Sequence, residues 1–258
     1  MGDSTTSRAA TLSIQRTDLQ QRLADLPPEK LAALHRKLQQ KRQPLQPIRR
    51  LPDKSYYPLS FHQQRLWFIE QFQPGTPLYN VSRAMMLGGP LQYPALKSTL
   101  QTLLDRHESL RTTFHVLDGE PMQRINPLVE LELPVVDLRA EGADTDAALK
   151  QHLSSEGQYA FDLAEDLLFR PVLYRLADDR HVLQMTIHHL ACDGWSLRLL
   201  FNELAVLYRD FCSGQVPDIP PVALRYVDFA RWQREPRQQQ LFAERIEWWK
   251  QHLADAPG

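Results

Sequence analysis

Alternating helical and strand patterns run through most of this sequence and constrain its fold more than any other feature. From residue 58 onward, segments with apolar residues at helical spacing alternate with short segments rich in β-branched and aromatic residues. The expected helices cover residues 60–73, 94–107, 143–157, 196–211 and 238–253, and the expected strands cover 79–87, 110–117, 123–126, 132–137, 169–176 and 181–189. This alternation, with its hairpins, predicts an α/β (α+β) two-layer sandwich built on a mixed β-sheet.

Charge divides the sequence at about residue 50. Residues 1–50 carry 10 Lys and Arg against 4 Asp and Glu, whereas residues 51–258 carry 20 against 27. Within the basic part, Pro28 opens a helix with a leucine stripe that later prolines end. We therefore expect a basic helical linker or docking segment over 1–50 and a separate domain over 51–258. One amphipathic helix does not distinguish a solvated linker from an element that docks another polypeptide.

The composition excludes several classes of protein. The 258 residues are 43% hydrophobic and 24% charged, with a net charge of −1, so no overall basic field exists for nucleic acid or an anionic membrane. Cys192 and Cys212 are too few for a disulfide framework and lack the spacing of a zinc site. Residues 1–10 lack the apolar region of a secretory signal, and no apolar run approaches the ~18 to 20 residues that cross a bilayer. We expect a cytoplasmic protein.

The residues best suited to catalysis lie at the end of the last expected strand and just after it, in the stretch HHLACDG at 188–194. Successive side chains on a strand point to opposite faces, so a core-facing His188 leaves His189 facing a cleft. There, His189 is free to act as a general base or as a hydrogen-bonding group near neutral pH. Gly194 permits a backbone conformation or an approach that a Cβ would prevent, and its N–H could meet a developing oxyanion.

Other chemistries have weaker support in the sequence. Two histidines and an aspartate are legitimate metal ligands, but opposed strand faces separate the imidazoles and no third or fourth ligand lies nearby at helical spacing. Cys192 has no local cationic activator except the histidines. No Gly-x-Ser-x-Gly elbow, P-loop or Gly-x-Gly-x-x-Gly loop occurs. We therefore expect neither a metal nor a bound cofactor.

Four stretches, in the correct order, resemble the core motifs of nonribosomal peptide synthetase condensation domains, within the chloramphenicol acetyltransferase-like superfamily. The stretches are LSFHQQRLW at 59–67 (SxAQxRLW), RHESLRTTF at 106–114 (RHExLRTxF), HHLACDG at 188–194 (HHxxxDG) and YVDFARW at 226–232 (YxDFAxW). His62 stands where the family usually has alanine, and Arg231 where a valine is common. The resemblance covers roughly residues 58–257.

The resemblance implies a fold and a reaction. It implies one acetyltransferase-like lobe of a V-shaped pair, with the active site in a tunnel between the lobes. The implied reaction is amide formation between an acyl or peptidyl thioester on a donor carrier protein and the amine of an aminoacyl thioester on an acceptor carrier protein. The substrates would be held by the phosphopantetheine of these carriers, and the domain itself would bind no cofactor. Residues 1–50 are then a candidate docking segment for an upstream synthetase subunit.

The same resemblance implies roles for individual residues. His189 and Gly194 are the expected catalytic residues, with Gly194 lying against the substrate path. His188 and Asp193 are expected to support the site, and Asp193 is expected to pair with an arginine, for which Arg65 is the candidate. An α-amine has a pKa of about 7.7–8.0, so a sizeable share of the amine, although not most of it, is already neutral at cytoplasmic pH and a strong base is unnecessary. We expect His189 mainly to orient the amine and accept its proton.

The sequence ends soon after the last expected helix, which by the resemblance closes the first lobe. The second lobe and its later motifs are absent from these 258 residues. We therefore expect negligible condensation activity from this chain alone, because one wall of the tunnel is missing. The tryptophans at positions 67, 232, 248 and 249 are expected to pack in the core.

Alternative functions stay open on the sequence. A stand-alone acyltransferase of the same superfamily would share most motifs, and an epimerisation domain would share HHxxxDG. A non-catalytic docking or scaffold module of a synthetase would carry a vestigial motif. The fit of the first two motifs, and Trp195-Ser196 after HHxxxDG, favour condensation. The retained His189, Asp193 and Gly194 argue against a vestigial site.

Overall fold

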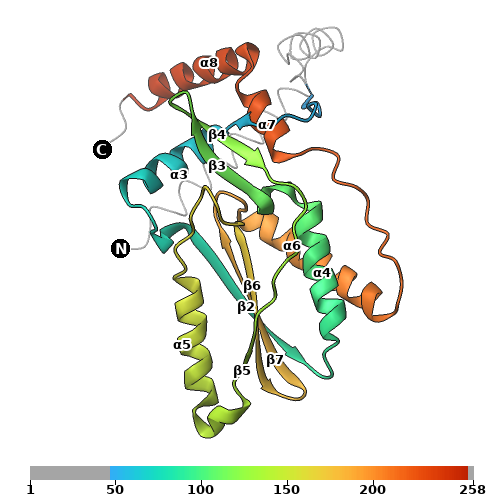
Figure 1. The fold of residues 1–258 in the computed structure, drawn as a ribbon. Coiled ribbons are helices and arrows are strands. Elements are labelled where there is room, and N and C mark those ends of the chain that lie inside the picture. Colours follow the sequence, from blue (N-terminus) through green and yellow to red (C-terminus); the bar gives the residue numbers. More distant parts are fainter. Residues whose placement is uncertain (1–46, 255–258) are drawn as a thin grey trace, which may run out of the picture. The chain divides into compact units, whose positions relative to one another are not determined.

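The computed structural model describes residues 47–254, which alternate between helices and strands (Figure 1). The chain divides into two units, Met1–Pro47 and Ile48–Gly258, and only the second is described below. The helices expected before residue 47 lie outside the described residues, so the proposed boundary near residue 50 stays a prediction. Within 47–254, no helix combines the length and the apolar character needed to cross a membrane.

Most predicted elements are present, with shifted ends. The strands are β1 (Tyr57–Pro58), β2 (Asn80–Gly88), β3 (Thr112–Leu117), β4 (Glu120–Ile125), β5 (Val135–Asp137), β6 (Phe169–Ala177) and β7 (Arg180–His188). The α-helices are α3 (Phe61–Phe72), α4 (Tyr93–Arg106), α5 (Thr145–Gly157), α6 (Gly194–Cys212), α7 (Tyr226–Gln233) and α8 (Pro236–His252). The 3₁₀ helices are η1 (Pro77–Tyr79), η2 (Glu108–Arg111) and η3 (Arg139–Asp144). The strand expected over 132–137 begins only after Pro134, which has no N–H to donate to a ladder.

The larger sheet is mixed, as predicted. Its strand order is β2-β7-β6-β5, with antiparallel pairing of β2 to β7 and of β7 to β6, and parallel pairing of β5 to β6. A smaller antiparallel sheet has the order β1-β4-β3. The two-residue turn between β3 and β4 places Asp118 and Gly119 at φ values of 53° and 81°, the left-handed pair that a tight hairpin needs.

Helices cover both faces of the larger sheet (Figure 1). On one face, α4 and α6 contribute a leucine-rich core that packs against alternate residues of β7. The largest contributors from the helices are Leu96, Leu100, Leu103, Leu104, Leu200 and Leu207. On the other face, α5 packs against a smaller cluster that includes Tyr174 and Val182. Each buried leucine contributes about 1.5–3 kcal/mol, so these clusters fix the position of the sheet and of the end of its inner strand β7. The α/β class with a mixed sheet is confirmed, but the larger sheet lies between helices on both faces and not in two layers, because β6 and β7 bury apolar side chains on both sides.

Helix α3 is fixed at its first turn, next to the end of β7. Ser60 accepts a hydrogen bond from the Gln63 backbone N–H at 3.1 Å, and the Gln63 side chain accepts one from the Ser60 N–H at 2.9 Å, which forms a capping box. A third core cluster joins Leu59 and Leu66 to Leu190, just beyond β7. The beginning of α3 is therefore held beside the histidine motif.

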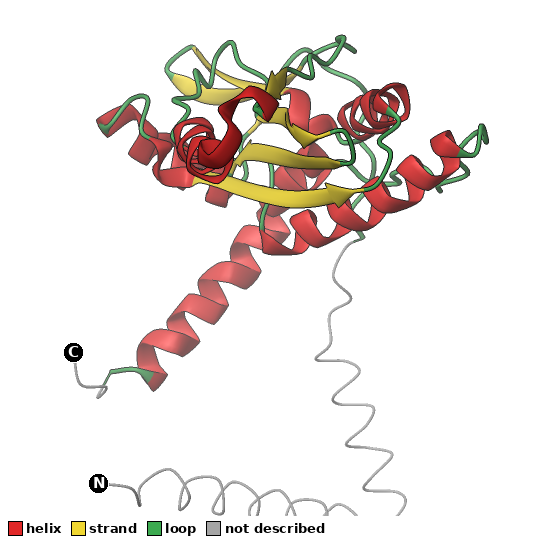
Figure 2. Ribbon diagram, turned by 90° about the horizontal axis from the view of Figure 1, so that it is seen from below, coloured by secondary structure: helices red, strands yellow, loops and turns green. Residues whose placement is uncertain are grey.

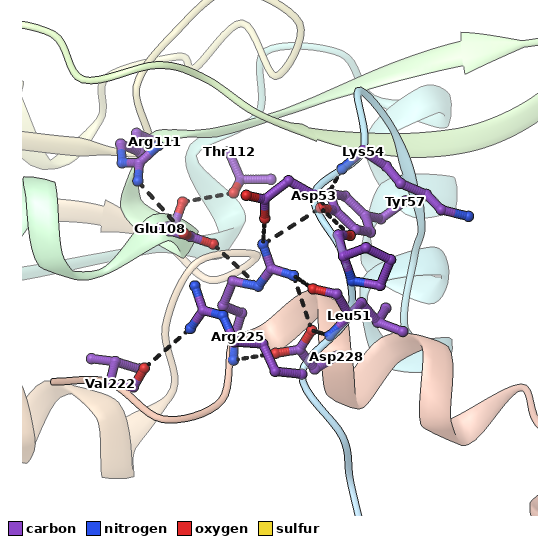
Figure 3. A network of polar contacts seen from close by, with 12 residues as sticks. Leu51, Asp53, Lys54, Tyr57, Glu108, Arg111, Thr112, Val222, Arg225 and Asp228 are labelled. Atoms are coloured by element: carbon purple, nitrogen blue, oxygen red, sulfur yellow. Dashed lines mark hydrogen bonds and ion pairs between the residues drawn. The ribbon is translucent and has the colours of Figure 1, made fainter.

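A buried arginine links the start of the described chain to α7 (Figure 3). Arg225 lies 2.6 Å from Asp53 Oδ1, donates to the Leu51 carbonyl at 2.6 Å and lies 3.3 Å from Asp228 Oδ1. Its side chain is 5% exposed, and that of Asp228 is completely buried. The Asp228 carboxylate also accepts the Leu51 N–H at 2.9 Å. This network explains structurally why the YVDFARW stretch carries an aspartate.

The expectation of core packing is wrong for two of the four tryptophans. Trp67 is partly buried against the α3 cluster, and Trp232 is half-buried and stacks on Phe229. Trp248 and Trp249, by contrast, are 49% and 55% exposed. They lie near the end of α8, which projects from the rest of the described domain (Figure 2). The large aromatic side chains led us to predict burial. Burial also requires an element that packs against them, and residues 47–254 provide none that covers Trp248 and Trp249.

Candidate active site

A cavity of about 540 Å³ lies where β7 ends and α6 begins. Side chains from the start of α3, from η2, from the β7–α6 connection and from α7 line it. Its titratable lining residues are His62, His107, His189, Cys192, Asp193 and Tyr226. The strand-to-helix stretch singled out in the sequence therefore forms one wall of a cavity.

The two adjacent histidines of the motif occupy different environments, as strand alternation predicts. His188 is 1% exposed, packs against the rings of Tyr79 and Phe161, and accepts a hydrogen bond from the Leu190 N–H at 3.2 Å. Burial, and then the neighbouring charge of His189, lower the pKa of His188 to about 4. His188 is therefore neutral at physiological pH, whereas His189 is half-buried and lines the cavity.

The His189 imidazole has one nitrogen available to a ligand. Its backbone N–H donates to the Tyr79 carbonyl at 2.8 Å, which extends the β2–β7 pairing by one residue. The side-chain Nδ1 is buried and has no hydrogen-bond partner among the described residues, which leaves Nε2 as the nitrogen that opens on the cavity. No carboxylate within residues 47–254 holds the ring, so the arrangement suits a hydrogen-bonding and proton-accepting group.

Asp193 caps α6, and the expected pair with Arg65 is not formed. The Asp193 Oδ1 accepts the Ser196 N–H at 2.8 Å and the Ser196 hydroxyl at 2.6 Å. These hydrogen bonds lower the pKa of Asp193, and the nearby His189 adds to the effect. Arg65 is exposed on α3, and no ion pair joins it to Asp193 within the described residues. The expected pair is therefore absent from the described residues, and Asp193 instead acts as the N-cap of α6 through Oδ1.

Gly194 is the first residue of α6, and the conformational reason given for a glycine there is wrong. Its φ is not positive, and a Cβ built on it would meet no described atom within 4 Å. It is exposed and is not among the residues that line the cavity. Its N–H lies in the first turn of a helix, where backbone N–H groups have no acceptor in the preceding turn. Its implied place against the substrate path stays a prediction.

Three further site residues were not identified from the sequence. His62 lies with its ring centroid 6.1 Å from that of His189. The Tyr226 hydroxyl lies 3.0 Å from the Ser60 hydroxyl, which joins α7 to the α3 cap. His107 Nε2 lies 2.7 Å from Glu203 Oε2 on α6. Each of the three belongs to one of the quoted motif stretches, so motif membership was the signal that could have found them.

A second cavity of about 810 Å³ adjoins the first. The two share part of their lining, and the shared residues are His107, Ser109, Ser196, Tyr226 and Phe229. The second cavity extends toward Arg50 and Arg106. Space therefore continues away from His189 along the wall formed by η2 and α7.

The described part of the chain contains no group of residues that could hold a metal ion, and the cysteine at the cavity is unreactive. No group of three or more His, Cys, Asp or Glu among residues 47–254 is arranged to hold a metal ion. Cys192 is buried, and burial, followed by the charge of Asp193, raises its pKa to about 12. The thiol is therefore protonated near neutral pH and is a poor nucleophile.

Comparison with curated proteins identifies relatives in peptide-synthesising enzymes. The chain is 37% identical over 210 residues to one of the subunits of linear gramicidin synthase from Brevibacillus parabrevis, a match that covers 81% of this chain and 3% of that protein. It is 38% identical over 244 residues to phosphinothricin tripeptide synthetase PhsC of Streptomyces viridochromogenes, covering 93% of this chain and 22% of that protein. The chain thus spans a small part of the length of these relatives.

Solved structures share the fold. The X-domain in a complex with OxyB from teicoplanin biosynthesis matches with a TM-score of 0.69 and 30% identity, covering 82% of this chain and 46% of that chain. A double mutant of the starter condensation domain of rhizomide synthetase RzmA, solved with C8-CoA and Leu-SNAC, matches with a TM-score of 0.71 and 24% identity, over 78% of this chain and 46% of that chain. The family model described as "Condensation domain" matches residues 53–257. The chain belongs to the condensation-domain family.

Proposed function

We propose that this chain supplies the histidine-bearing wall of a site that forms an amide bond in nonribosomal peptide synthesis. The observation that supports the proposal is His189, which presents an accessible Nε2 to a cavity at the end of a strand. Membership of the condensation-domain family gives this geometry its chemical context. The substrates are an acyl or peptidyl thioester and the amine of an aminoacyl thioester.

In the proposed reaction the amine nitrogen attacks the thioester carbonyl carbon. The C–N bond forms, the C–S bond breaks, and the sulfur leaves as a thiol. His189 orients the amine and accepts the proton that its nitrogen loses. A positioned group of this kind contributes about 10²–10⁴-fold to the rate. His188, neutral and buried behind it, holds the end of β7 in place.

We propose that both substrates arrive on the phosphopantetheine arms of carrier proteins. The adjoining cavities of about 540 and 810 Å³ offer space for a long, narrow substituent that reaches His189 from outside. The RzmA domain was solved in complex with C8-CoA and Leu-SNAC, and coenzyme A itself contains a phosphopantetheine arm. In this proposal the domain itself needs no bound cofactor.

The test measures amide formation directly. This chain, joined to a second condensation-domain lobe, is incubated with an acyl-loaded donor carrier and an aminoacyl-loaded acceptor carrier, and the product is followed by mass spectrometry. His189→Ala is expected to lower the rate by about 100-fold or more. The matched control, His152→Ala, removes an exposed histidine on α5 and is expected to leave the rate unchanged. Equal rates for His189→Ala and the unaltered protein would contradict the proposal. The 258-residue chain, assayed alone, tests the expectation of negligible activity.

We also propose that residues 1–50 dock an upstream synthetase subunit. Their excess of positive charge supports attraction to an acidic partner segment. Deleting them is expected to slow transfer from a natural upstream subunit while leaving transfer from a free, excised carrier unchanged. Unaltered transfer from the natural subunit after the deletion would favour a simple linker.

A further inference from the structure

A second imidazole lies beside His189, and the reaction described above does not use it. The ring centroids of His62 and His189 are 6.1 Å apart, with their planes at 60°. Both side chains line the cavity of about 540 Å³. They differ in access to water, because His62 is exposed and His189 is half-buried.

The position of His62 is set by the cap of α3. His62 is the second residue of the helix, directly after Phe61, so the capping box fixes the backbone that carries it. The cap hydroxyl of Ser60 is in turn 3.0 Å from the hydroxyl of Tyr226, on another wall of the same cavity. The backbone that carries the imidazole is therefore fixed by two elements that both line the cavity.

The proton balance of amide formation needs an exit from the cavity. Near neutral pH an α-amine, with a pKa of about 7.7–8.0, arrives mostly as an ammonium ion. An ammonium ion and a thioester give an amide, a thiol and one free proton. The nitrogen loses one proton before the C–N bond forms and another afterwards, and the thiol sulfur keeps only one of them. His189 has a single nitrogen open to the cavity, so it holds one of these protons at a time.

We propose that His62 takes the surplus proton from His189 and releases it to solvent. A single bridging water can connect imidazoles at this separation, and the exposed side of His62 completes the path. His62 acts through His189, so it is a positioning residue for proton transfer. This inference rests on the amide-forming function proposed above.

The other titratable side chains on the surrounding elements do not offer the same exit. Burial lowers the pKa of His188 to about 4, so it stays neutral. Hydrogen bonds within the first turn of α6 lower the pKa of Asp193, so it stays ionised. Burial raises the pKa of Tyr226, so its hydroxyl keeps its proton. None of these three groups exchanges a proton near neutral pH.

The remaining titratable groups near the two imidazoles are also unsuited to carry the proton to solvent. Burial raises the pKa of Cys192 to about 12. His107 lies 2.7 Å from Glu203, which is its own proton partner. Arg234, next to α3, is a permanent cation whose guanidinium donates to Gln64 Oε1 at 2.8 Å. His62 is thus the group that both faces His189 and reaches water.

The direction of the pH dependence follows from the state of the amine. Below about pH 8 the ammonium form increases, and each turnover must export a proton. Above about pH 8 the neutral amine dominates, and the one proton it loses is the one that the sulfur keeps. Loss of His62 is therefore expected to be severe at low pH and mild at high pH.

The experiment compares amide formation by the same two-lobed protein, that is, this chain joined to a second lobe, and by its His62→Ala variant across this range. At about pH 6.5 the variant is expected to be about 10- to 100-fold slower, and at about pH 9 less than about twofold slower. Added imidazole is expected to restore the rate at low pH, because the exposed site left by the alanine admits it. The variant is expected to fold, since alanine is favourable in a helix and the replaced side chain is exposed.

His152→Ala, assayed with and without imidazole, is the matched control and is expected to match the unaltered protein at every pH. A His62→Ala defect that is independent of pH, or that imidazole does not reduce, would overturn the role of His62 while leaving amide formation intact. Absence of product from the unaltered protein would instead overturn the proposed function, and the His62 proposal with it.

Discussion

Two polar clusters of this domain, the Arg225 network and the histidine cavity, differ in how many of their side-chain polar atoms have partners. The two terminal nitrogens of the Arg225 guanidinium have close partners, with Asp53 at 2.6 Å, the Leu51 carbonyl at 2.6 Å and Asp228 at 3.3 Å (Figure 3), and its Nε lies 3.8 Å from Glu108 Oε2 without a hydrogen bond. The His189 side chain has no hydrogen-bond partner among residues 47–254, and its Nδ1 is buried.

The difference indicates which polar groups stabilise the fold and which are available to bind a ligand. Most buried polar groups in proteins are hydrogen-bonded, so the network is what a stable link between segments requires. A cavity whose imidazole lacks partners leaves its hydrogen-bonding capacity for a ligand instead. Substitutions in the network should therefore change stability first, and substitutions in the cavity should change activity first.

The largest expected effect is the loss of stability in Arg225→Met. This change leaves the fully buried carboxylate of Asp228 without its cationic partner. Removing one member of a buried ion pair costs about 3–5 kcal/mol. The free energy of unfolding, measured in urea by circular dichroism, is expected to fall by that amount.

Arg139→Met is the matched control for that prediction. Arg139 lies 2.6 Å from Asp137 and 2.8 Å from Asp178, but all three side chains are substantially exposed. Exposed ion pairs contribute about 0–1 kcal/mol. Equal losses in the two variants would show that burial of Arg225 is not what makes its network strong.

The next largest effect is a pH dependence that comes from His188. Its pKa in the folded chain is lowered to about 4 by burial, below the value of about 6.5 for a free histidine. A depressed pKa contributes stability that is present above about pH 6.5 and is lost as the pH falls through about 4. At about 1.4 kcal/mol per pKa unit, this loss is up to about 3 kcal/mol.

The comparison for this prediction is His188→Asn, which can still accept the Leu190 N–H but does not titrate in this range. Urea unfolding from about pH 7 to about pH 4 is expected to show a steeper fall for the unaltered chain than for the variant. If the free energy of unfolding falls equally with pH in both proteins, protonation of His188 does not destabilise the folded chain.

A smaller effect on stability is expected at Asp193, which both caps α6 and lines the cavity of His189. Asp193→Ala removes the cap of α6 and is expected to cost about 1 kcal/mol in the free energy of unfolding. Asp193→Asn keeps an oxygen that can accept the Ser196 N–H, so its stability should match the unaltered chain. If Asn also keeps full amide-forming activity, the aspartate acts through the cap. Lost activity at retained stability would show that its charge acts on His189.

Sequence reasoning predicted best where one element determines the outcome by itself. The leucines at 197, 200, 204 and 207 recur at helical spacing, and all four are buried in α6. Alternation along the strand likewise predicted that a core-facing His188 leaves His189 facing a cleft, and His189 lines the cavity, although burial itself does not alternate from His181 to His188. These expectations use only local periodicity, which the fold preserves.

Predictions that depended on distant elements were incomplete or wrong. His62 and Tyr226 line the same cavity, and the hydrogen bond that joins their helices runs from Tyr226 to the Ser60 cap of α3. The Arg65 pairing with Asp193 depended on the direction of an α3 side chain that residue spacing alone does not determine. The exposure of Trp248 depends on what packs against α8, which helical periodicity does not reveal.

The smallest expected change in stability is that of Gly194→Ala. The new Cβ meets no described atom within 4 Å, and the backbone there is not left-handed, so the variant should lose nothing and gain up to about 0.5 kcal/mol from helix propensity. If the substrate path passes this position, the same Cβ lies where a substrate from outside the chain must approach. Amide formation should then fall by about 10-fold or more while the unfolding curve stays in place. The free energy of unfolding is sensitive to what packs against Gly194 within the chain, whereas the rate of amide formation is sensitive to a substrate that approaches it. If Gly194→Ala changes neither quantity, Gly194 does not lie against the substrate path.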